Sequence, residues 1–274
     1  MLLPGDYVRI KKPGINEGRM GLCIGFDNIL DEYKIQVLFT EKEIYCEKSE
    51  VQKITEKQFN ELIPKLQLDG CDYFLFDYDL KSTSEVLRNN VYLKGLYALG
   101  YYFPTNRYPE KNKEDPFSQT IIKFKNHQYS ALSTGEKLAA DIFTFFLNSK
   151  TLKSIISDVE YCFLMPTTKN KNHVSYWTRP LINKLRLKDI SDYVYIVKKL
   201  DYYKYKKAYE RKRMVKDAIL FKPPSNERIQ LQGKKALIFD DICTTGNQIN
   251  ELTNTLNKHG INEVYAFVLG KSKK

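Results

Sequence analysis

The sequence predicts an α/β protein with a mostly parallel sheet and flanking helices, preceded by a small all-β barrel. Residues 234–239 are an apolar run, residues 250–259 repeat apolar side chains at helical spacing, and residues 263–269 are apolar again. This β-loop-α-β order places two strands side by side and parallel. A further apolar run covers residues 160–165, whereas residues 1–54 hold only short alternating segments.

The first 54 residues are expected to fold as the barrel. Turn residues separate short alternating segments, which predict strands within residues 5–10, 22–25, 33–39, 43–46 and 51–54. The Gly5-Asp-Tyr-Val8 opening resembles that of SH3-like, KOW and Tudor-type barrels. Such barrels bind nucleic acids, peptides or a neighbouring domain. Residues 1–54 hold 8 basic and 9 acidic residues, which favours a protein-docking or structural role over an autonomous DNA-binding surface.

Residues 55–115 form a linker region in this interpretation. We expect a helix over residues 56–66, a strand over residues 72–77 and a helical start to residues 84–101. Pro104, Pro109 and Pro116 stand among Asn, Lys and Glu, so residues 102–116 are predicted to be a flexible loop.

Residues 116–274 are expected to be the α/β domain. Its first half contains a predicted helix over residues 136–147 and a strand over residues 160–165, which stops at Pro166 before a polar, basic loop. The next predicted elements are a helix over residues 176–187, a strand over 193–197, a basic stretch over 198–216 and a short strand over 218–221.

The strongest functional signal directly follows residues 234–239. Two adjacent carboxylates, Asp240 and Asp241, precede the sequence Ile-Cys-Thr-Thr-Gly-Asn-Gln, which opens the helical pattern. The first N–H groups of a helix lack intrahelical partners and lie at the positive end of its dipole, so they stabilise a phosphate. Gly246 permits a positive φ and close backbone approach. The acids can accept hydrogen bonds from vicinal hydroxyls or lie near a divalent cation, so this order suits a phosphorylated sugar.

The stretch Phe239-Asp-Asp-Ile-Cys-Thr-Thr-Gly246 resembles the signature with which type I phosphoribosyltransferases bind phosphoribosyl diphosphate (PRPP). More weakly, residues 116–271 resemble the ComF-like members of that family, through the segments 121–124 and 210–218. The chain departs from the family pattern at Gln248, where Thr or Ser is usual, and at Met214, where Asn is usual. The ComF sequence Arg-Gly-Phe-Asn-Gln and the cysteine pairs of its zinc ribbon are missing.

The resemblance implies a set of site residues. Asp240 and Asp241 would be the catalytic acids that hold the ribose hydroxyls. The 5′-phosphate would lie in the loop formed by Cys243, Thr244, Thr245, Gly246, Asn247 and Gln248. Pyrophosphate would be held by Lys123, Thr167, Thr168, Lys169, Arg211 and Arg213. Mg²⁺ would arrive with PRPP and lie near the acids without a direct protein ligand, and a variable hood, placed at residues 67–115, would contact the acceptor.

Composition sets the outer limits. A chain of 274 residues can hold about two domains, and no apolar run approaches the roughly 20 residues that cross a bilayer. The start of the chain lacks a secretory signal pattern, and five scattered cysteines suit a reducing, cytoplasmic setting. Residues 151–274 carry 24 basic and 12 acidic residues, against 20 and 21 in residues 1–150. The excess positive charge therefore lies in the half expected to bind the polyanion PRPP.

Two functions stay open at this point. The first is a phosphoribosyltransferase that transfers the phosphoribosyl group of Mg-PRPP to an unidentified, nucleobase-like acceptor and releases pyrophosphate. The second is a non-catalytic PRPP- or nucleotide-binding accessory protein of the ComF type, in DNA uptake or processing. Tyrosines alternate with lysines in residues 198–216 and would suit nucleic acid, although such a stretch is equally typical of a solvated face. The oligomeric state is open as well.

Overall fold

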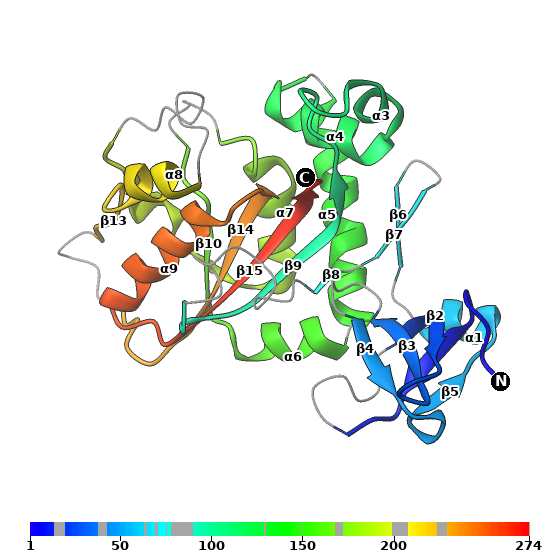
Figure 1. Cartoon of the computed structure of the whole chain (residues 1–274). Helices are drawn as coiled ribbons and strands as arrows, with labels where there is room; N and C mark the ends of the chain where they lie inside the picture. Colours follow the sequence, from blue (N-terminus) through cyan, green and yellow to red (C-terminus); the bar gives the residue numbers. More distant parts are fainter. Residues whose placement is uncertain are drawn as a thin grey trace.

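The computed structural model describes residues 1–13, 20–37, 43–62, 65–68, 71–74, 76–77, 90–128, 130–148, 150–167, 172–198, 208–223 and 229–273. Within these residues the chain forms an N-terminal antiparallel sheet and a larger, mostly parallel sheet flanked by helices (Figure 1). The predicted α/β class and the separate N-terminal β structure are confirmed.

The N-terminal sheet contains five strands in the order β4-β3-β2-β1-β5. Their bounds are Tyr7–Ile10 (β1), Met20–Asp27 (β2), Glu32–Val37 (β3), Glu43–Cys46 (β4) and Val51–Lys53 (β5). Each predicted strand is present, and alternate side chains such as Val8, Ile10 and Ile35 form a core of their own. Within the described residues no ladder joins the edge strands β4 and β5, which the turn Lys48–Glu50 connects. The five strands thus form one antiparallel sheet, and its closure into a barrel stays a prediction.

The segment after this sheet differs from the sequence-based expectation. Helix α1, Glu56–Leu62, places Phe59 against Tyr7, with the ring centroids 4.0 Å apart. The helix predicted to reach residue 66 ends at Leu62 because Lys65–Leu68 (β6) pairs with Cys71–Phe74 (β7) in a hairpin. The strand predicted over residues 72–77 is divided between β7 and Phe76–Asp77 (β8). Residues 84–89, the predicted helical start, lie outside the described part of the chain.

The large sheet has the strand order β11-β10-β14-β15-β9-β8. Its strands are Leu93–Tyr102 (β9), Tyr161–Leu164 (β10), Lys188–Asp189 (β11), Lys235–Cys243 (β14) and Glu263–Ser272 (β15), all parallel, with β8 antiparallel at the edge. Strand β9 is buried on both faces, as expected of a strand within a covered parallel sheet. It lies in the region expected to be linker, so the sheet takes in residues that precede position 116.

Helices and a small ribbon cover the two faces of the sheet. Leu237 and Phe239 share a core with Pro116–Lys125 (α4), Ala131–Asn148 (α5), Lys150–Asp158 (α6) and Ser175–Leu185 (α7). Ala236 and Ile238 face Asn247–Lys258 (α9) and the ribbon formed by Val194–Ile196 (β12) and Ile219–Phe221 (β13). Helix α8, Ala208–Val215, precedes β13 (Figure 1). None of the helices in the described segments is long and apolar enough to cross a membrane.

The flexible loop predicted over residues 102–116 contains a helix in its second half instead. Helix α3 spans Pro109–Glu114, and α4 starts directly afterwards at Pro116. Both prolines occupy the start of their helix, where the missing N–H costs nothing and the fixed φ is already helical. Asp115 caps α4, because its side chain accepts a hydrogen bond of 2.7 Å from Ser118 N. The prolines therefore begin helices here rather than preventing them.

Candidate functional site

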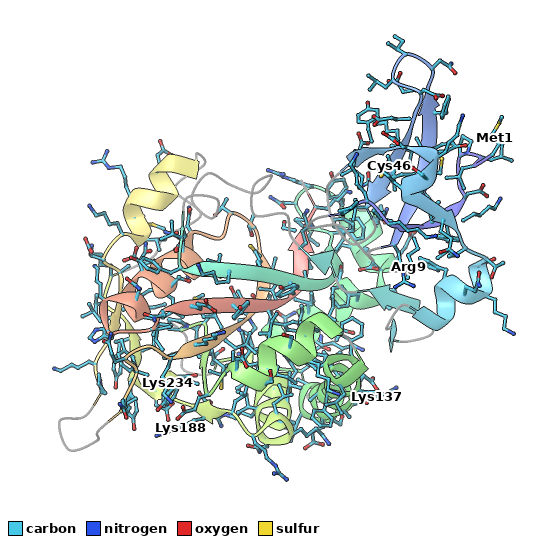
Figure 2. The ribbon with its side chains drawn as sticks, turned by 90° about the horizontal axis from the view of Figure 1, so that it is seen from below. Met1, Arg9, Cys46, Lys137, Lys188 and Lys234 are labelled. Carbon is cyan, nitrogen blue, oxygen red and sulfur yellow. The ribbon has the colours of Figure 1, made fainter. Side chains whose placement is uncertain are left out.

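A cleft of about 400 Å³ opens at the carboxyl ends of β9, β14 and β15. In Figure 1 these strand ends form the upper edge of the sheet, below α3 and α4. Figure 2 shows Lys188 and Lys234 near each other at the opposite, amino-terminal edge, and Arg9 and Cys46 in the N-terminal sheet, which Met1 precedes. Open α/β sheets bind ligands at their carboxyl edge. The cleft is lined by Tyr102, Pro104, Asn106, Arg107, Lys125, Asp240, Asp241, Ile242, Cys243, Thr244, Thr245, Gly246, Asn247, Gln248, Ile249 and Ser272.

The loop expected to hold a phosphate lies entirely in this cleft, from Cys243 to Gln248. Gly246 adopts φ 74°, a left-handed conformation that favours glycine, and it caps α9 without a side-chain hydrogen bond. The first helical bond runs from Asn250 N to Gly246 O at 2.8 Å. The N–H groups of the first turn belong to residues that come before Asn250. They lie at the amino end of a 12-residue helix, which is the positive end of the helix dipole. This geometry suits an anion.

The two acids lie where β14 runs beyond its neighbour. Strand β10 pairs with β14 only as far as Phe239, whose carbonyl accepts a last hydrogen bond from Met165 N at 2.8 Å. Asp240 and Asp241 follow one another at this strand end, and their carboxyl groups lie close enough to interact with each other. Each is only 8% exposed and still lines the cleft. Carboxylates are rarely so buried unless they are paired.

Asp241 is fully engaged by neighbouring donors. Its Oδ2 lies 2.9 Å from Lys125 Nζ and 2.9 Å from His173 Nε2, and its Oδ1 accepts a hydrogen bond from Ile242 N at 2.7 Å. Burial alone would raise the pKa of Asp241, but the hydrogen bond from His173 and the charge of Lys125 outweigh it and hold that pKa below its usual value. Asp241 is therefore a stable carboxylate.

Asp240 has a different environment. Its Oδ1 accepts a hydrogen bond of 2.8 Å from Asp241 N. Burial, and then the neighbouring Asp241 carboxylate, raise the pKa of Asp240 well above its usual range. Burial lowers the pKa of Lys125, because it disfavours the charged ammonium group. The charge of the Asp241 carboxylate outweighs burial and raises the Lys125 pKa above its ordinary value. Among the residues that the structure describes, the cleft thus holds two cations, Lys125 and Arg107, against one firmly ionised carboxylate, a balance that favours an anionic ligand.

The predicted pyrophosphate residues are not brought together in the same way. Lys123 lies in α4, two positions from Lys125, and only Lys125 lines the cleft. Two positions turn a helix by roughly 200°, so the two lysines point apart. Thr167 follows β10 and is not among the lining residues.

The other predicted pyrophosphate residues divide into two groups. Thr168, Lys169 and the side chain of Arg211 lie outside the described structure. Arg213 lines a separate cavity of about 330 Å³ beside α9, together with Lys216 and Lys258. Asn247 lines both this cavity and the main cleft. Arg213 is therefore near α9 but not in the cleft that holds the acids.

Several site residues were missed by sequence reasoning. Lys125 is the second lysine of the run that contains Lys123, and only the helical phase distinguishes the two. His173 contacts Asp241 across 68 positions of sequence, which no local pattern encodes. Tyr102 and Arg107 lie in the segment read as a flexible loop. Both residues belong to the region in which a hood was expected, and the hood itself stays a prediction.

The acid pair does not fit a directly bound Mg²⁺. That ion requires near-octahedral oxygen ligands, whereas Asp241 already accepts bonds from an ammonium group, an imidazole and a backbone N–H. In the described part of the chain, no group of three or more His, Cys, Asp or Glu residues is placed to hold a metal ion.

The fold and the site define an α/β protein with an anion-favouring cleft at the carboxyl edge of its sheet. No model of a known protein family and no curated protein sequence matches this chain.

Proposed function

We propose that the cleft binds the phosphorylated ribose of PRPP and that the protein transfers its phosphoribosyl group to a nucleobase-like acceptor. The observation that supports this most is the convergence of the Asp240-Asp241 pair and the first turn of α9 on one cleft. A 5′-phosphate would accept hydrogen bonds from the first turn of α9. The ribose hydroxyls would lie beside Asp240, whose carboxyl group has fewer partners than that of Asp241.

In the proposed reaction the bond between C1 of the ribose and a pyrophosphate oxygen breaks, and pyrophosphate leaves with the electron pair. A bond forms between C1 and an acceptor nitrogen, and the proton of that nitrogen passes to solvent water. The transition state resembles a ribosyl oxocarbenium ion, so the protein mainly positions groups and offsets charge. Lys125 and Arg107 would offset the charge of the anionic ligand. Mg²⁺ remains part of the proposal as an ion carried by the pyrophosphate, and the proposed location remains the cytoplasm.

A second candidate is a non-catalytic protein of the ComF type that binds PRPP or a nucleotide, in DNA uptake or processing. The specific observation in its favour is that Lys125 and His173 already occupy Asp241. Gln248, in the first turn of α9, supports the same alternative because a shorter hydroxyl residue is usual there in the family. Pyrophosphate release from Mg-PRPP with a panel of nucleobases would distinguish the enzyme from the binder.

Calorimetric titration with Mg-PRPP tests the binding proposal. Asp241→Asn removes the charge that holds Lys125 and His173, so we expect Mg-PRPP affinity to fall by about 1–2 kcal/mol, the scale of a lost charged hydrogen bond. Asp158→Asn is the matched control, because Asp158 pairs with Lys235 at the opposite edge of the sheet. Unchanged affinity in Asp241→Asn, or equal losses in both variants, would reject the assignment.

A further inference from the structure

The ammonium group of Lys125 lies between an acid and the open cleft, a position that a bridging cation would occupy. Its Nζ is 2.9 Å from Asp241 Oδ2 and 5.7 Å from the centroid of the Tyr102 ring. The Lys125 side chain is 36% exposed and lines the cleft, whereas the Asp241 side chain is 12% exposed. An ammonium group has three N–H donors. One binds Asp241, and the exposed side of the group can donate to a ligand.

The fold fixes this lysine in place from several directions. Phe117, Ile121 and Phe124 anchor α4 in the core, which sets the position of its last residue, Lys125. A cation in the last turn of a helix is also stabilised by the helix dipole. The titratable groups near the ammonium are Asp241, Asp240, Tyr102 and His173, which shares Asp241 Oδ2 with Lys125. Lys125 is therefore a built part of the cleft and not a mobile surface lysine.

We propose that Lys125 is the resident counter-ion of the cleft, which bridges Asp241 to the anionic ligand so that the sugar-phosphate end binds without a divalent cation. This inference rests on the proposed function and concerns the same cleft. A metal ion bound to Asp241 would face the Lys125 ammonium and His173 across one carboxylate oxygen. The metal ion and the Lys125 ammonium are both positively charged and would repel each other. The lysine and a directly bound metal ion therefore exclude one another.

Ribose 5-phosphate is the suitable probe, because it lacks the pyrophosphate that would bring Mg²⁺ with it. Its affinity for the full chain is measured by calorimetry in EDTA and in Mg²⁺. We expect the wild-type affinities to agree within about twofold. Lys125→Met should weaken binding in EDTA by about tenfold or more, the loss of a charged hydrogen bond to phosphate or hydroxyl oxygen.

Lys184→Met is the matched control. Lys184 also lies in the last turn of a helix, α7, and its Nζ is also 5.7 Å from an aromatic ring centroid, that of Phe143, but it does not line the cleft. The Lys184→Met variant should bind ribose 5-phosphate with the same affinity as the wild type. Because Lys125→Met leaves Asp241 without its cation, Lys125→Arg provides a second variant. It keeps the charge and should retain metal-independent binding, with the fold checked by circular dichroism.

Each other result has a defined meaning. Wild-type binding that requires Mg²⁺ would overturn the counter-ion role and leave the proposed function in place. Undiminished affinity in a folded Lys125→Met protein would overturn it as well. Absence of ribose 5-phosphate binding under both conditions would reject the proposed function, and this inference with it.

Discussion

At the scale of single residues, the two adjacent acids differ in the donors that surround them. Asp241 faces α4 and His173, whose donors stabilise its carboxylate. Asp240 accepts a backbone hydrogen bond from Asp241 and is buried beside that charge. The pair therefore combines one permanent anion with one group that is costly to ionise.

This difference predicts that Asp240→Asn stabilises the protein at neutral pH. The folded-state pKa of Asp240 is raised above its unfolded value, which is about 4. Asp240 therefore contributes its full stability below that unfolded pKa, and this contribution is lost as the pH rises. Asparagine keeps the acceptor for Asp241 N without the charge. We expect a higher Tm at pH 7.5, by roughly 2–4 °C for each kcal/mol gained, and little gain near pH 4. A lower Tm at pH 7.5, measured by circular dichroism, would contradict this account.

At the scale of elements, helices α5 and α7 approach each other closely at one glycine. A Cβ at Gly135, in α5, would lie 2.3 Å from the carbonyl oxygen of Tyr176, in α7. Helix α7 follows His173, the residue that contacts Asp241. The spacing of the two helices is therefore coupled to the position of one of the site residues.

Gly135→Ala tests this coupling. Alanine is favoured over glycine in a helix by about 1 kcal/mol, but the backbone clash should cost more, since overpacking typically costs about 1–3 kcal/mol and here the obstacle is backbone. We expect a net loss of stability in urea unfolding. Gly25→Ala, where a Cβ meets no atom within 4 Å, is the control and should change stability little. A stabilised Gly135→Ala protein would show that the helices separate freely.

Sequence patterns predicted some elements well and others poorly, for physical reasons. Strand β14 and helix α9 were predicted because an apolar run, a turn and helical spacing follow one another over residues 235–258. Strand β9 was missed because a strand buried on both faces shows no alternation, and its leucines and alanine also suit a helix. The Lys125–Asp241 pair joins residues far apart in sequence, so only the folded chain reveals it.

At the scale of the whole molecule, charge composition and the site agree only in part. The excess of basic residues lies in residues 151–274, whereas Arg107 and Lys125, the cations that line the cleft, come from the nearly balanced first half. The parallel sheet explains this, because β9 and the helices after it bring residues 102–125 to the carboxyl ends of β14 and β15. The N-terminal sheet has its own core, and none of its described residues lines the cleft.

The most direct test of the central claim is the electron density of crystals soaked with Mg²⁺ and PRPP. We predict a phosphate within hydrogen-bonding distance of the first-turn N–H groups of α9, a ribose beside Asp240, and Lys125 still paired with Asp241. Density for PRPP at another surface, or an empty cleft at saturating PRPP, would contradict the account.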